Sequence, residues 1–241
     1  MAFHYSPKIV TDDLVFVLDA GNRKSYSGTG TAWNDLSGNS NHMTLTGSPV
    51  FNPANNGSIT FDGTDDYAAI GGNNIPSTNP LSLYGITNFS IEVLVNGNGT
   101  GNANQHILAK GDPIGLVGWA LTYGDPATAD ELGFFISETE VVGNATSGTL
   151  TGITDFGNWA HYTVTKSGTT FKLYKNGVLF DTTTDSTAVV STTHDFKVGK
   201  PHHSEDHELN GNVAIARVYH KALTQSEIIQ NFNATKSRFG L

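Results

Sequence analysis

The sequence predicts an all-β fold: a two-sheet antiparallel sandwich of the jelly-roll type that closes with one short helix. Three observations support this prediction. Short segments in which apolar residues alternate or run together recur at close intervals, as in sandwiches and jelly rolls. The chain has 27 glycines and only 15% charged residues, which fits many turns better than long helices. The final strand signal leads directly into a capped helix.

Residues 14–18 form a continuous apolar run, typical of a strand that is buried on both faces. The loop-like residues 22–42 follow. Further strands are predicted at 58–61, 67–70, 89–95, 106–110, 118–123, 132–136, 159–166, 170–174, 178–181, 195–199 and 211–220. The clearest hairpin joins 170–174 to 178–181, because Asn176-Gly177 supplies the two positive φ angles of a type I′ turn.

The C-terminal part combines a strand and a helix. Small or apolar groups on both faces of residues 211–220 predict a strand in the interior of a sandwich. Thr224 and Glu227 have the spacing of a capping box, so a helix is expected near 225–235. Ile228, Ile229 and Phe232 then form its short apolar stripe.

We expect two regions in the 241 residues: an N-terminal arm at 1–13 and one sandwich domain at 14–241. The arm carries Phe3, Tyr5, Ile9 and Val10, and exposing each such group costs roughly 1.5–3 kcal/mol. We therefore expect the arm to pack, either on its own sandwich or on a neighbouring copy in a homo-oligomer.

Charge and composition disfavour several classes of partner. The net charge is −9 and no basic patch stands out, so a nucleic acid or an anionic lipid surface would be repelled. No apolar run is long enough to span a membrane, and residues 1–20 lack a signal-peptide pattern. The absence of cysteine excludes disulfides.

Several motifs occur in the order found in laminin-G-like proteins. They are Trp33–Asn39, Phe61–Tyr67, Asn158–Tyr162, Leu173–Gly177 and the Arg217-Val218-Tyr219 strand followed by the Ala222–Ile228 helix start. The chain thus resembles the laminin-G-like branch of the concanavalin A-like lectin/glucanase jelly rolls. Residues 18–22 and 229–241 resemble members found in structural proteins of tailed bacteriophages. This resemblance implies a virion protein with other virion proteins as partners.

Two segments are candidate metal sites. Asp62, Asp65 and Asp66 lie on one tight turn and could chelate Ca²⁺, although local backbone hydrogen bonds explain the same residues and are the favoured interpretation. His202, His203 and His207 could bind Zn²⁺ or Ni²⁺, but an exposed polar loop is the favoured interpretation there too.

A further metal position follows from the resemblance. Many concanavalin A-like jelly rolls hold a structural calcium with an aspartate near the start of the last strand, where this chain has Ala214. An alanine side chain cannot be a ligand, so this calcium is not expected.

Trp119 and Tyr123 are candidates for carbohydrate binding. They are four residues apart on one predicted strand and so share a face, where sugar rings could stack on them. Packing in the core is the alternative, and the sequence does not decide between the two.

Three functions remain. The first is a non-enzymatic bacteriophage virion protein, in a capsid decoration or tail fibre, that contacts host-surface carbohydrate. The second is a stand-alone carbohydrate-binding lectin module. The third is a divergent glycoside hydrolase or polysaccharide lyase that uses Glu92, Glu138 or Glu140. The strand motifs of carboxylates and arginines that such enzymes of the family carry are missing from this sequence. We therefore assign no catalytic residue and expect no enzyme.

Overall fold

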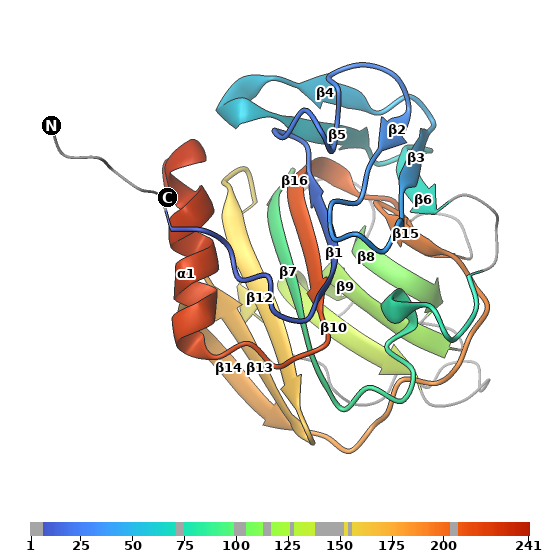
Figure 1. Ribbon diagram of the computed structural model, residues 1–241, viewed down its shortest axis with the longest axis vertical. Coiled ribbons are helices and arrows are strands. Elements are labelled where there is room, and N and C mark those ends of the chain that lie inside the picture. The colour runs from blue at the N-terminus through green and yellow to red at the C-terminus, as the bar shows by residue number, and fades with distance from the viewer. Residues whose placement is uncertain are drawn as a thin grey trace, which may run out of the picture.

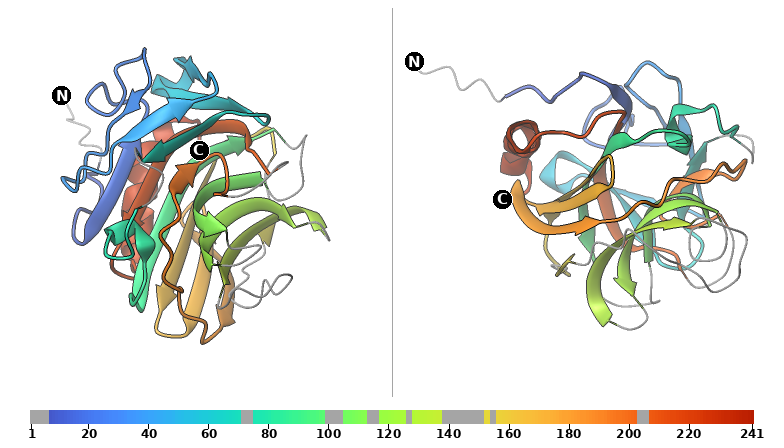
Figure 2. Two further views of the ribbon diagram at one scale, coloured as in Figure 1. Left: turned by 90° about the vertical axis from the view of Figure 1, so that its right-hand side faces the viewer. Right: turned by 90° about the horizontal axis from the view of Figure 1, so that it is seen from below.

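The computed structural model describes residues 7–70, 75–98, 105–112, 117–125, 128–137, 152–153, 156–202 and 207–241. In these residues the chain forms two antiparallel sheets packed as a sandwich, with one α-helix outside (Figure 1). Figure 2 shows the two layers from two further sides, with the helix lying outside them. The predicted jelly-roll class with a short C-terminal helix is confirmed.

The first sheet has the order β14-β13-β12-β7-β16-β5-β4, and β1 also pairs with β16. Its strands are β1 (Leu14–Asp19), β4 (Val50–Asn52), β5 (Ser58–Asp62), β7 (Asn88–Gly97), β12 (Ala160–Ser167), β13 (Thr170–Lys175), β14 (Val178–Thr184) and β16 (Asn210–Tyr219).

The second sheet has the order β11-β10-β9-β8-β15-β6-β3-β2. Its strands are β2 (Ala32–Trp33), β3 (Met43–Thr46), β6 (Tyr67–Ile70), β8 (Gln105–Asp112), β9 (Val117–Asp125), β10 (Thr128–Ser137), β11 (Gly152–Ile153) and β15 (Phe196–Val198). Short 3-10 turns occur at Ala54–Asn56, Pro80–Ser82 and Lys236–Arg238.

The main core lies between the sheets. The alternating face of β7 contributes Phe89, Ile91, Val93 and Val95, all of them fully buried, as the alternation predicts. Across the interface, the Trp119 ring of β9 packs among aromatic side chains of the second sheet.

The predicted hairpin is formed by β13 and β14. Asn176 and Gly177 have φ angles of 52° and 80°, the two positive values expected for the turn. The strands around the acidic turn behave differently from a hairpin. β5 belongs to the first sheet and β6 to the second, so residues 63–66 carry the chain from one layer to the other.

The helix α1 (Gln225–Thr235) covers the outer face of the first sheet, beside β12 (Figure 1). Its capping box is present as predicted: Glu227 N–H donates to the Thr224 hydroxyl, and Thr224 N–H donates to the Glu227 carboxylate. Of the predicted stripe, Ile228 is buried, whereas Ile229 is exposed.

A fully buried polar network holds this helix on the sheet. The Glu92 carboxylate lies 3.2 Å from Arg217 Nη1, accepts from Asn231 Nδ2 at 2.9 Å, and lies 3.7 Å from His161 Nε2. Burial is the main cause that lowers the pKa of His161 to about 4, so its imidazole is neutral at pH 7. Three strands and the helix therefore meet at one carboxylate.

The described part of the arm, residues 7–13, packs on the same face. Val10 is buried, its N–H donates to Asn231 Oδ1 at 2.7 Å, and its carbonyl accepts from the Tyr219 hydroxyl at 3.1 Å. For these residues the expectation of packing on the chain's own sandwich is confirmed. Phe3 and Tyr5 lie outside the described residues.

Candidate functional site

An open pocket forms where β1 and β5 meet along one edge of β16. β1 pairs with residues 215–219 of β16 and β5 pairs with residues 210–213, so the two strands lie end to end. At the junction Ala20 N–H donates to Ala214 O at 2.9 Å. The chain leaves the sheet on both sides of this point, and the two departing loops surround a hollow.

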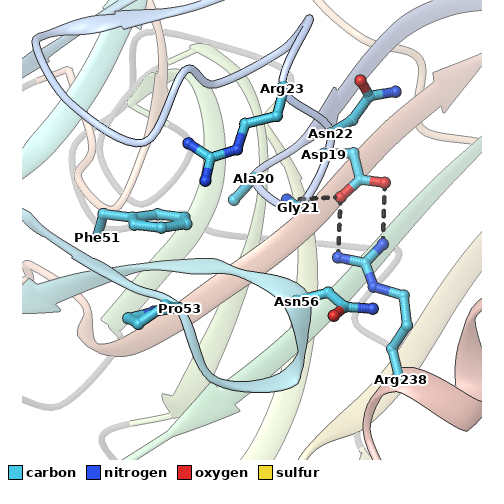
Figure 3. Close-up of a pocket in the computed structure, with 9 residues that line it drawn as sticks. All are labelled: Asp19, Ala20, Gly21, Asn22, Arg23, Phe51, Pro53, Asn56 and Arg238. Carbon is cyan, nitrogen blue, oxygen red and sulfur yellow. Dashed lines mark hydrogen bonds and ion pairs between the residues drawn. The ribbon is translucent and has the colours of Figure 1, made fainter.

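This hollow, the Asp19–Arg238 pocket, has a volume of about 640 Å³. That is within the range of small-molecule sites. Figure 3 shows the nine residues that line it: Asp19, Ala20, Gly21, Asn22, Arg23, Phe51, Pro53, Asn56 and Arg238. They come from the end of β1 and the loop after it, from β4 and the β4–β5 connection, and from the C-terminal tail.

A bidentate ion pair between Asp19 and Arg238 forms one wall of the pocket. Arg238 Nη1 and Nη2 donate to the two Asp19 carboxylate oxygens at 2.9 and 3.0 Å (Figure 3). Asp19 also accepts from Gly21 N–H at 2.9 Å. This geometry fixes the tail to the end of β1. Only glycine fits at position 21, because a Cβ there would lie 2.3 Å from the Asn56 carbonyl oxygen.

The other walls carry groups of different chemistry. Phe51 presents a half-buried ring, which contacts Tyr26 at a centroid distance of 5.3 Å. Arg23 and Asn56 are exposed, and Figure 3 shows their side chains on opposite sides of the opening. Asn55 and Asn56 both have left-handed φ angles, 54° and 65°, a conformation that asparagine tolerates better than most residues.

The pocket thus combines an aromatic ring with amide, carboxylate and guanidinium groups. Amides, carboxylates and guanidinium groups donate and accept the hydrogen bonds that sugar hydroxyls make, and an aromatic face packs on the apolar C–H face of a sugar ring. Among the described residues that line the pocket, Asp19 is the one carboxylate, and it is already neutralised by Arg238.

Trp119 and Tyr123 are core residues, which corrects the suggestion that they bind carbohydrate. Their exposed fractions are 0% and 2%, and the Trp119 indole N–H donates to Leu81 O at 3.0 Å. Tyr123 packs against Phe156. Neither ring can reach a sugar, because both point between the sheets.

The acidic turn brings its three carboxylates within 4.8 Å of one another. However, Asp66 is buried and accepts from the N–H groups of Ser48 and Asp62, while Asp62 accepts from Thr64 N–H. Burial is the largest cause that raises the pKa of Asp66. These hydrogen bonds match the interpretation of the turn as a structural one.

The histidine-rich segment is spread out in the described residues. His202 stacks on His194 at 4.0 Å, and its N–H donates to Gly111 O, whereas His207 packs on His106 near the other end of β8. Along β8 the two contacts are roughly 16 Å apart at ~3.3 Å per residue. A shared metal site for His202 and His207 is therefore not formed, and His203 lies outside the described residues.

Two further positions bear on metal binding and catalysis. The Ala214 methyl group packs with Leu94 and Phe239 and offers no ligand. Glu92 is fully buried against Arg217, so it is inaccessible to a polysaccharide. Glu138 and Glu140 lie outside the described residues.

Sequence reasoning did not find the Asp19–Arg238 pocket. Its residues come from three distant segments, and Asp19 and Arg238 are 219 positions apart. One signal could have indicated it: the chain has only three arginines, Arg23, Arg217 and Arg238, and two of them line this pocket.

Comparison with solved structures finds clostridial toxin binding domains. The binding domain of Paraclostridial Mosquitocidal Protein 1 matches with a TM-score of 0.70 and 15% identity over 93% of this chain and 52% of that one. The binding domain of Botulinum Neurotoxin DC in complex with SialylT matches with a TM-score of 0.69 and 15% identity over 93% and 52% of the two chains.

The same neurotoxin domain in complex with rat synaptotagmin II gives a TM-score of 0.67 and 16% identity over 94% and 52%. The chain spans about half the length of these structures, and at such identity the likeness concerns the fold. No curated protein sequence matches the chain.

No helix in the described part of the chain is long and apolar enough to cross a membrane. A family model matches residues 62–229, well over half of the sequence, and it describes the concanavalin A-like lectin/glucanases superfamily. The sandwich and this match together place the chain: it belongs to the concanavalin A-like lectin/glucanase superfamily, in its laminin-G-like branch.

Proposed function

We propose that the protein is a non-enzymatic carbohydrate-binding module and that the Asp19–Arg238 pocket holds the sugar. One observation carries this proposal: an open pocket of about 640 Å³ presents an aromatic ring beside exposed amide and guanidinium groups. Membership of a superfamily of lectins and glucanases supports sugar as the ligand. The buried state of Glu92 supports binding without hydrolysis.

A bacteriophage virion is the proposed location, with other virion proteins as partners and host-surface glycans as targets. The resemblance of residues 18–22 and 229–241 to phage structural proteins supports it. The two segments that carry the resemblance meet at the pocket through the Asp19–Arg238 pair. Mass spectrometry of purified phage particles should find the chain at stoichiometric copy number, and its absence from the particles would refute this location.

The sugar site is tested with a glycan array followed by calorimetry. Phe51→Ala removes the aromatic wall and should lower glycan affinity by about tenfold or more, since stacking and ring burial contribute roughly 1–3 kcal/mol. Val50→Ala is the matched control, because Val50 is adjacent and 63% exposed but does not line the pocket. It should bind as the wild type does.

Thermal unfolding of both variants separates binding from stability. Asn56→Gly provides a second pocket variant that removes the amide, and little effect on folding is expected because glycine adopts the left-handed φ of 65° at this exposed position. The proposal is wrong if the wild type binds no glycan at millimolar concentration. It is also wrong if neither pocket variant lowers the affinity for a glycan that the wild type binds. Reducing ends or unsaturated products released from a polysaccharide panel would show an enzyme instead.

A further inference from the structure

The three arginines of the chain have different surroundings. Arg217 is buried against Glu92, and Arg238 is paired with both carboxylate oxygens of Asp19. Arg23 is exposed, and its side chain makes one hydrogen bond, from Nη1 to Ser27 O. Among the described residues no carboxylate lies within ion-pair distance of it. Four of the five guanidinium N–H donors of Arg23 thus have no hydrogen-bond partner among the described residues.

The pocket consequently has a positive charge that its own walls do not cancel. Asp19 and Arg238 neutralise each other, which leaves Arg23 as the net charge of the lining. The chain as a whole carries −9, so this pocket is a local exception on an acidic protein. A negatively charged group is attracted here and repelled over most of the surface.

A second cavity adjoins the ion pair. This arm groove has a volume of about 400 Å³, and its lining combines apolar residues that include Pro7, Ile9 and Leu36 with polar and charged ones. It shares Asp19 and Arg238 with the first pocket. The ion pair is therefore a common wall, and a ligand longer than one sugar ring can contact both hollows.

From these features we infer that the ligand is an acidic oligosaccharide, with a sugar carboxylate bound to Arg23 and the next unit lying over the Asp19–Arg238 pair toward the arm groove. This inference rests on the proposed function. A sugar carboxylate suits this position because its two oxygens match the planar guanidinium fork. The apolar residues of the groove suit the C–H faces of the following sugar ring, and its polar residues suit the hydroxyl groups.

The experiment uses the full chain and calorimetry with defined probes. Oligogalacturonides of one to four units are compared with the same oligomers after reduction of their carboxyl groups, and sialyllactose is compared with lactose. In the wild type, the acidic members of these pairs should bind about tenfold or more tightly than the neutral members. Affinity should also rise from one unit to two.

Variants assign each part of this preference. Arg23→Gln should remove the preference for the acidic probe and leave weak binding of the neutral one, while Arg23→Lys should keep only part of it. Lys24→Gln is the matched control, because Lys24 is an exposed neighbouring cation that does not line the pocket. It should leave the preference unchanged. Leu36→Ser should reduce the gain from the second unit without changing binding of the single unit.

The outcomes separate this inference from the function it rests on. Suppose that acidic and reduced oligosaccharides bind the wild type with equal affinity and that Phe51→Ala binds neither. The inference of an acidic ligand would then be wrong, but the pocket would remain a sugar site. A preference that survives Arg23→Gln would overturn the role of Arg23. Equal affinity for one and two units in the wild type would overturn the extension into the groove. Failure of every probe and of the glycan array would refute the sugar site itself.

Discussion

Breaking the buried pair between Glu92 and Arg217 should destabilise the protein strongly. Glu92→Leu leaves the Arg217 guanidinium buried, with only 2% of the residue exposed and without its carboxylate. Removal of one partner of such a pair costs about 3–5 kcal/mol. At about 2–4 °C per kcal/mol for a domain of this size, the melting temperature should fall by roughly 6–20 °C.

The double variant Glu92→Leu with Arg217→Leu should be more stable than the Glu92→Leu single variant. It removes both charges, and its remaining cost, about 1–2 kcal/mol, comes from the hydrogen bonds that Asn231 Nδ2 and Thr163 Oγ1 lose with the Glu92 carboxylate. Urea unfolding gives the free energies of the four proteins in the cycle, and a coupling energy of about 2 kcal/mol or more is expected.

A surface pair provides the control cycle. Lys221 Nζ lies 2.9 Å from the Asp12 carboxylate, whose side chain is 75% exposed, so this coupling should stay below about 1 kcal/mol. If the Glu92 and Arg217 substitutions prove additive, or couple no more strongly than the surface pair, the argument from burial is wrong.

Three further predictions concern acid stability, the helix start and the core. The pKa of His161 is near 6.5 in the unfolded chain and about 4 in the folded one, so the unfolded chain binds more protons between these values. The free energy of unfolding should therefore fall as pH drops from 6.5 to 4. The urea midpoint of His161→Gln should fall less than that of the wild type over the same pH range. Thr224→Ala should lower the free energy of unfolding by about 0.5–2 kcal/mol, because the helix loses its N-cap. Ser226→Ala, at an exposed position in the same turn, should change it little. Equal losses of thermal stability in the two variants would contradict this prediction. Trp119→Phe should cost about 1–3 kcal/mol because a buried carbonyl loses its donor, and should leave glycan affinity unchanged; a selective loss of affinity would return Trp119 to the binding site.

Local patterns predicted most of the strands, the Asn176-Gly177 turn and the capped helix, because each depends on neighbouring residues alone. The short strands β2, β3, β4 and β11 were not predicted, and β2 lies in a segment expected to be a loop. Patterns that depend on distant partners were less informative. A period of two places Trp119 and Tyr123 on the same face but does not say which face meets the other sheet. Likewise, an Asp-Gly turn signals a reversal without specifying that β5 and β6 belong to different layers.

The pocket was beyond local prediction for the same reason. Its lining depends on the pairing of both β1 and β5 with one edge of β16. It also depends on the ion pair between Arg238, in the C-terminal tail, and Asp19. Neither contact has a signature in a short window of sequence. The rarity of arginine in the sequence was the usable signal, since two of the three arginines line the pocket.

The pairing of β1 with β16 has a consequence for how the chain folds. In the described part of the chain, the first strand, β1, pairs with the last strand, β16, alone. The contact of Val10 with Asn231 likewise joins positions 221 residues apart. Such closures are slow, because the loop entropy must be lost before the contacts form. During synthesis, β7 lacks one of its neighbours until β16 emerges, which leaves an aggregation-prone strand edge. Refolding yield should therefore depend more on the integrity of the last strand and helix than on any loop in the middle of the chain.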